Sequence, residues 1–128
     1  MKLLLKNIGV LVVGIIIGMI VNMGLIIIGG TFFSVPDNFE PMNAMNWDLK
    51  YFLFPFFAHS IGTFSGAFIS SKLSNNYHII IPIIVGLYFL SGGIYMVTIL
   101  PAPIWFICLD LIVCYIPMAL LGWSLNKK

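Results

Sequence analysis

His59 and Asp110 are the side chains in this sequence best suited to proton or cation chemistry, because each lies inside a long apolar run. An acid within a membrane helix costs about 2.5–3.5 kcal/mol on insertion scales. We therefore expect Asp110 to face other protein groups and either find a partner or stay protonated. His59 is the titratable residue expected at a matching depth in another helix. Such residues mark ion paths and proton relays in membrane proteins, so the pair is a candidate site.

Other kinds of chemistry find little support in the sequence. It contains no Ser-His-Asp order, phosphate-binding loop or cluster of metal ligands, so we expect no enzyme activity, cofactor or metal site. Cys108 and Cys114 lie six residues apart, about 9 Å along a helix, which exceeds disulfide reach. We interpret both as small packing residues. The net charge of +2 without a basic patch gives no reason to expect nucleic-acid binding.

Four long apolar runs must position these side chains. Of the 128 residues, 61% are hydrophobic and 8% charged, whereas a soluble domain carries about 25% charged residues. The runs cover 7–29, 51–71, 79–99 and 104–123, and each reaches the roughly 20 residues that a membrane-spanning helix needs. Lipid offers no hydrogen-bond partners, so the backbone N–H and C=O groups of these runs must pair with each other within helices. The sequence therefore predicts a single all-α transmembrane domain over 1–128, an integral membrane antiparallel four-helix bundle.

The first run begins like a signal peptide, with Lys2 and Lys6 before an apolar stretch. That stretch is longer than the 7–15 residues or so of a signal core, so we expect a retained helix. Lysine placement predicts the orientation, because cytoplasmic loops are enriched in Lys and Arg. Five lysines (2, 6, 72, 127 and 128) would share one side, against Lys50 and three acids on the other. This pattern predicts that both termini are cytoplasmic (N-in/C-in).

The connections are short except the first. The residues of 74–77 are typical of a turn, and the two prolines in 100–103 predict a stiff corner. The outer loop 31–50 is compatible with a short helix lying on the membrane and with a plain loop. Pro117, seven residues after Asp110, is expected to kink the fourth helix and open space near the acid.

Small residues indicate how the helices pack. Gly14 and Gly18 lie four apart in the first run, and Gly62 and Gly66 four apart in the second. Membrane helices associate through close contact at such small residues. We expect helices 1 and 2 to pack on each other through these glycines; the alternative is that one pair forms a dimer contact.

Polar residues of all four helices fall at one depth in the outer half of the predicted bundle. At about 1.5 Å per residue, His59 lies roughly 12 Å and Asp110 roughly 9 Å from the outer surface. Asn22, Ser91 and Tyr95 are expected at roughly 10, 12 and 6 Å. One interpretation is a hydrogen-bonded cluster that fixes helix register, and the other is a proton- or cation-responsive binding site.

Several segments resemble small, uncharacterised four-helix membrane proteins of bacteria, with which most of the chain shares short motifs. The resemblance rests on Ala-His-Ser-Ile-Gly-Thr-Phe-Ser-Gly-Ala at 58–67, Val-Asn-Met at 21–23, Pro-Ala-Pro-Ile-Trp-Phe at 101–106 with Asp110, and Tyr-Ile-Pro-Met-Ala at 115–119. It implies no activity. Together with the Ile, Asn and Lys usage, it indicates a multi-pass protein of a bacterial inner membrane.

Two functions fit these observations. The first is a structural or accessory membrane component that is embedded in the lipid bilayer, and it is compatible with a homodimer or a larger membrane assembly. Its basis is the small size, the absence of catalytic motifs and the small-residue faces. The alternative is a small proton- or cation-coupled transporter or channel that uses the polar layer around His59 and Asp110. The small multidrug exporters share the size and helix count but carry an essential acid in their first helix, which this chain lacks.

Overall fold

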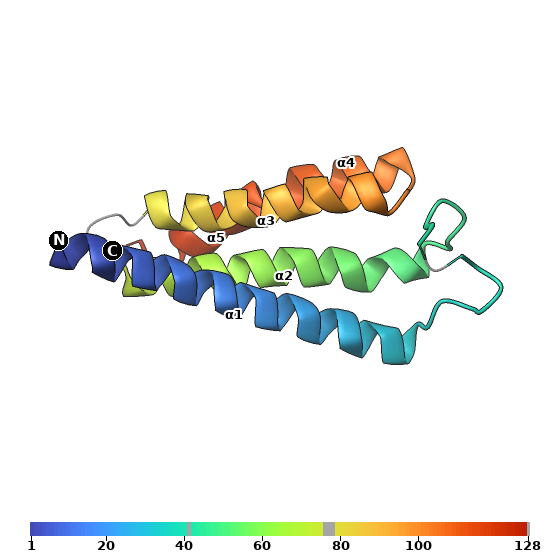
Figure 1. Ribbon diagram of the computed structural model, residues 1–128, viewed down its shortest axis with the longest axis horizontal. Helices are drawn as coiled ribbons and strands as arrows, with labels where there is room; N and C mark the ends of the chain where they lie inside the picture. The colour runs from blue at the N-terminus through green and yellow to red at the C-terminus, as the bar shows by residue number, and fades with distance from the viewer. Residues whose placement is uncertain (41, 76–78, 128) are drawn as a thin grey trace.

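The computed structural model describes residues 1–40, 42–75 and 79–127, and in these ranges it is all-helical, without strands. The helices are α1 (Lys2–Phe32), α2 (Lys50–Leu73), α3 (Ile80–Ile99), α4 (Ile104–Val113) and α5 (Ile116–Ser124). They run side by side along the long axis of the molecule (Figure 1). Four stretches of the described chain are long and apolar enough to cross a membrane, with α4 and α5 together forming the fourth, Ile104–Ser124. The predicted all-α, four-helix architecture is confirmed.

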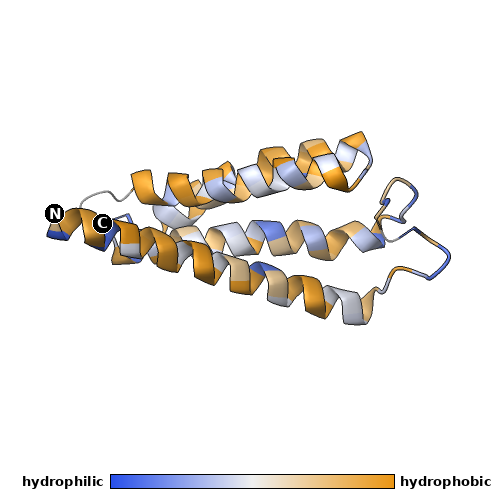
Figure 2. Ribbon diagram, viewed as in Figure 1, coloured by the Kyte–Doolittle hydropathy of each residue, from blue (hydrophilic) through white to orange (hydrophobic). Residues whose placement is uncertain are grey.

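Apolar side chains cover the outside of the bundle as well as its interior. Hydrophobic residues predominate along the helices, and hydrophilic residues lie at their ends, in the connecting loop and midway along α1 and α2 (Figure 2). Large hydrophobic residues such as Ile20, Leu87 and Ile112 are about half exposed or more. A surface of this kind is stable in lipid, where apolar side chains need no burial.

Helices α1 and α2 make the most extensive contact in the bundle, and glycines allow it. A Cβ atom added to Gly14 would lie 2.8 Å from the Gly66 carbonyl oxygen. One added to Gly62 would lie 3.0 Å from the Gly18 carbonyl oxygen. The two backbones therefore approach too closely for any larger residue, as the spacing of these four glycines predicted for helices 1 and 2.

The fourth span is not the continuous helix predicted for 104–123. It is interrupted at Cys114 and Tyr115, where the backbone forms a turn between α4 and α5. Pro117 explains the interruption, because it has no N–H to donate to the carbonyl of Val113 and its ring collides with that carbonyl. Tyr115 leaves the helical conformation, with φ −112° and ψ −82°, and its carbonyl then accepts the Ala119 N–H at 2.8 Å.

The outer loop folds over one end of the bundle as a series of turns. Residues 33–40 and 42–49 contain no helix, so of the two possibilities for 31–50 the plain loop is correct. The backbone N–H of Ala44 donates to the carbonyl of Pro101 at 2.8 Å, which ties the loop to the corner between α3 and α4. The predicted turn at 74–77 lies partly outside the described residues.

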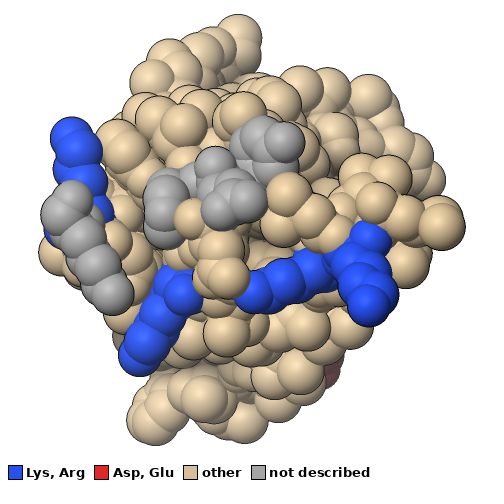
Figure 3. All heavy atoms as spheres, turned by 90° about the vertical axis from the view of Figure 1, so that its left-hand side faces the viewer, with Lys and Arg blue, Asp and Glu red and all other residues tan. Residues whose placement is uncertain are grey.

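Both termini lie at the opposite end of the bundle from this loop (Figure 1). Lys2 begins α1, Lys72 lies in the last turn of α2, and Lys127 follows α5. Viewed from this end, lysine side chains extend across the face (Figure 3).

Candidate functional site

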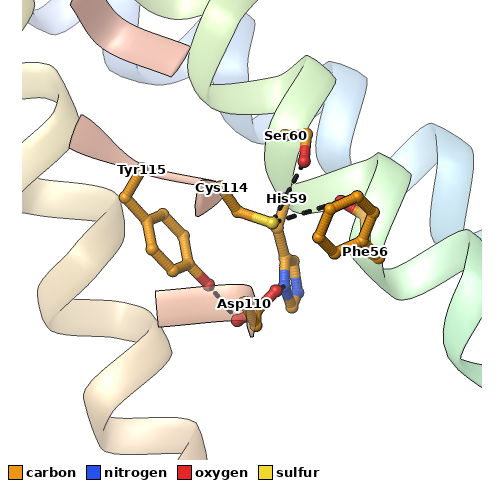
Figure 4. A network of polar contacts seen from close by, with 6 residues as sticks. All are labelled: Phe56, His59, Ser60, Asp110, Cys114 and Tyr115. Carbon is orange, nitrogen blue, oxygen red and sulfur yellow. Dashed lines mark hydrogen bonds and ion pairs between the residues drawn. The ribbon is translucent and has the colours of Figure 1, made fainter. Parts of the chain in front are cut away.

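Side chains from two spans meet at the carboxylate of Asp110. Nδ1 of His59, on α2, lies 2.6 Å from Oδ1 of Asp110, on α4. The hydroxyl of Tyr115, in the turn before α5, donates to Oδ2 of Asp110 at 2.9 Å. Figure 4 shows the three side chains directed toward one another across the gap between the helices. Each carboxylate oxygen therefore has its own partner, and the Asp110 side chain is only 8% exposed.

These contacts define which histidine nitrogen is available for proton exchange. Asp110 accepts a hydrogen bond from the Tyr115 hydroxyl, and as a carboxylate it also accepts a hydrogen bond from the N–H at Nδ1 of His59. Nδ1 is thereby engaged by Asp110, which leaves Nε2 as the ring nitrogen that faces away from the carboxylate.

A second chain of polar contacts lies beside the first. The Ser60 hydroxyl donates to Sγ of Cys114 at 3.0 Å, and the Cys114 thiol lies 3.6 Å from the carbonyl oxygen of Phe56, to which it donates (Figure 4). Cys114 is fully buried and Cys108 is exposed, and both are free thiols. Cys114 therefore packs as predicted and in addition joins α2 to the turn of the fourth span.

Tyr115 reaches Asp110 because the helix is interrupted and because Gly93 leaves room. In a continuous helix a residue five positions after Asp110 would point about 140° away from it. A Cβ atom on Gly93 would lie 2.5 Å from the Tyr115 hydroxyl oxygen, so no larger residue fits there without displacing the phenol. The Tyr115 ring also stacks on His59, with centroids 6.0 Å apart. Sequence reasoning missed Tyr115; the available signal was Pro117, two residues later.

Two cavities meet at His59. The first, of about 250 Å³, extends from His59 and Asp110 to Ala44 and Trp47 of the outer loop. The second, of about 270 Å³, lies between His59, Tyr115 and the residues of α1 and α3 that face them. His59, Gly93 and Met96 line both. The His59 side chain is 22% exposed, in keeping with this open position.

The other residues predicted for the polar layer are placed less uniformly. Asn22 and Tyr95 line the second cavity, although Tyr95 is 64% exposed. Ser91 does not join the layer: it is exposed and donates to the Tyr88 carbonyl of its own helix at 2.6 Å. A serine in a helix commonly satisfies its hydroxyl in this way, so matching depth did not ensure matching direction. The structure brings His59 and Asp110 into contact and leaves Ser91 outside.

Within the described ranges, no three His, Cys, Asp or Glu side chains gather where they could hold a metal ion. Comparison of the chain with protein-family models, curated proteins and solved structures gave no match.

Proposed function

We propose that this protein is a multi-pass protein of a bacterial inner membrane with both termini in the cytoplasm. Support comes from the lysines at the end of the bundle that carries the termini (Figure 3). The loop at the other end contains Asp37, Glu40 and Asp48 with a single lysine, Lys50. This is the asymmetry that positively charged cytoplasmic loops produce.

The orientation can be tested by cysteine labelling in intact cells. In a Cys108→Ser background, Asn38→Cys in the outer loop should react with a membrane-impermeant maleimide. Asn75→Cys, between α2 and α3, should react only after the cells are opened. Labelling of position 75 in intact cells would reverse the proposed topology.

We further propose that the protein is a small proton-coupled transporter whose proton site is His59 with Asp110 and Tyr115. The observation that carries this proposal is the 2.6 Å contact between Nδ1 of His59 and Asp110 at the meeting point of two cavities. A cluster that only fixed helix register would be expected in a closely packed interior. Here, open space adjoins the histidine instead, and ionisable residues beside cavities in membrane helices mark proton and ion paths.

The proton site can be tested without knowing the transported substrate. In protein labelled with ¹⁵N-histidine, the ring resonances of His59, assigned with His59→Gln, should show a proton on Nδ1, because Asp110 accepts it at 2.6 Å. In the matched variant Asp110→Asn, this preference for Nδ1 should be lost. A wild-type His59 whose Nδ1 carries no proton would refute the site.

Transport itself is tested in proteoliposomes that contain a pH-sensitive dye. An imposed pH gradient should dissipate faster with the wild-type protein than with His59→Ala or Asp110→Asn. Equal rates for all three proteins, each reconstituted to the same level, would exclude a pathway through this site.

A structural or accessory role remains the second proposal, and α1 supports it. This helix has few buried residues, and a Cβ atom added to Gly9, Gly24 or Gly30 would meet nothing within 4 Å. Another membrane helix could approach closely along these small residues. Purification in mild detergent separates the roles: a stable complex with another protein supports the accessory role, and a monomer or homo-oligomer alone counts against it.

A further inference from the structure

The cavity between the outer loop and the proton site has an unusual lining. Of its fourteen lining residues, His59 and Asp110 alone carry ionisable side chains, at its inner end. The other lining residues are Gly, Ala, Pro, branched aliphatic, Met, Phe and Trp, and no Lys or Arg is among them. The side chains that can carry a formal charge in this cavity are therefore those of Asp110 and His59.

Aromatic rings form one wall of this cavity. The ring of Trp47 lies 5.9 Å from that of Phe52, and Phe52 lies 4.5 Å from Phe106. The wall therefore continues from the outer loop across α2 to α4, the helix that also carries Asp110. Aromatic faces attract cations, most strongly where water is excluded, and Met96 adds a polarisable thioether.

We propose that this cavity binds a small organic monocation, an alkyl- or arylammonium, and that the cation displaces the proton held by His59. This inference rests on the proposed function and names the substrate class of the same site. When the cation enters, the N–H bond at Nε2 of the His59 imidazolium breaks and the proton passes to water. The cation then replaces the imidazolium as the positive charge beside Asp110, so the net charge of the site is unchanged.

Other ligand classes fit the lining less well. An anion would be repelled by Asp110, and a hydrated metal ion would find no ring of oxygen ligands to replace its water. A neutral apolar molecule would gain from the apolar walls but would bring no positive charge to replace the imidazolium beside Asp110. The volume of about 250 Å³ is slightly smaller than the roughly 300–1,000 Å³ of typical ligand pockets, so it suits a small ammonium.

The test uses phenyltrimethylammonium, whose charge does not depend on pH, and its neutral isostere tert-butylbenzene. Each is titrated by calorimetry into the purified protein in lipid nanodiscs, with protein-free nanodiscs as the blank. The cation should bind, and binding in weak buffer should release up to one proton for each cation bound. The isostere should neither bind competitively nor release protons.

Variants of the protein separate the contribution of the Asp110 carboxylate to cation binding from that of the aromatic wall. Asp110→Asn should weaken binding of the cation at least tenfold and abolish proton release. Phe106→Leu, which leaves the carboxylate intact, should weaken it by about three- to thirtyfold, the worth of one cation–aromatic contact. Phe57→Leu is the matched control, because Phe57 is exposed and lies outside the lining of this cavity; its affinity should equal wild type.

Three results would overturn the inference: no binding of the cation, equal binding of the isostere, or binding unaffected by both Asp110→Asn and Phe106→Leu. None of them touches the pH-gradient assay in proteoliposomes, which tests the proton site independently. If the gradient dissipates through the site and the cation fails to bind, the proton site stands and the substrate class is wrong.

Discussion

Two adjacent glycines of α3 should respond in opposite directions to the same substitution. A Cβ atom on Gly93 would lie 2.5 Å from the hydroxyl oxygen and 2.7 Å from Cζ of Tyr115. A Cβ atom on Gly92 would meet nothing within 4 Å. Gly93→Ala must therefore displace the phenol that donates to Asp110, whereas Gly92→Ala adds a methyl group to open space.

The magnitude follows from three contributions. Overpacking a tight interface destabilises by about 1–3 kcal/mol. Loss of a hydrogen bond to a charged group adds about 1.5–3 kcal/mol, although interhelical hydrogen bonds in membranes average only about 0.6 kcal/mol. Replacing glycine by alanine within a helix returns about 1 kcal/mol. We expect Gly93→Ala to lower the free energy of unfolding by about 0.6–5 kcal/mol, and Gly92→Ala to leave it unchanged or raise it slightly.

Unfolding in mixed micelles by titration with a denaturing detergent, followed by tryptophan fluorescence, measures both variants. A double-mutant cycle with Tyr115→Phe then isolates the hydrogen bond. Because phenylalanine has no hydroxyl to displace, Gly93→Ala should cost less in that background. If Gly93→Ala is as stable as Gly92→Ala, the close contact between α3 and Tyr115 is wrong, and with it the support for Tyr115 at the site.

Three further predictions follow from the same geometry. Gly14→Ala should destabilise the protein by about 1–3 kcal/mol, because its Cβ would lie 2.7 Å from that of Ser70, and Gly24→Ala, in open space, should not, as thermal unfolding in detergent can show. In folded protein in detergent, N-ethylmaleimide should label the exposed Cys108 and spare the buried Cys114 until the chain is unfolded, as mass spectrometry can count; early double labelling would contradict the buried turn. Pro117→Ala should let α4 and α5 join, so that hydrogen exchange at the new amide becomes slow; an amide that exchanges as fast as those of the loops would mean that the turn does not depend on the proline.

The sequence predicts the spans well because two requirements coincide in each of them. A run such as 79–99 must be about 20 residues long to cross lipid, and lipid forces its backbone to be helical. The structure places that helix at Ile80–Ile99, one residue from the predicted start. The close contact of α1 with α2 could be predicted equally well, because two glycines four residues apart leave a stretch of backbone that another helix backbone can approach.

The direction of a side chain could be predicted from the sequence less well than its depth in the membrane. Asp110 and His59 meet as expected, because neither can be satisfied by its own helix or by lipid. Ser91 can donate to the carbonyl three residues earlier and needs no partner in the bundle. The position of Tyr115 depends on the turn between α4 and α5. Pro117 indicates where this turn lies but not the direction in which it points the Tyr115 side chain. The contact between Tyr115 and Asp110 could therefore be identified only from the structure.

That turn bears directly on whether the polar cluster only holds the helices together. A register-fixing contact between α2 and the fourth span needs one hydrogen bond, and His59 with Asp110 already supplies it. The chain also interrupts a membrane-spanning helix to add Tyr115, and it leaves two open pockets of about 250 and 270 Å³ that are both lined by His59. An interrupted helix loses backbone hydrogen bonds. A cluster selected for packing alone would be expected to fill that space, so the open surroundings of His59 favour a site that exchanges a proton over one that only anchors helices.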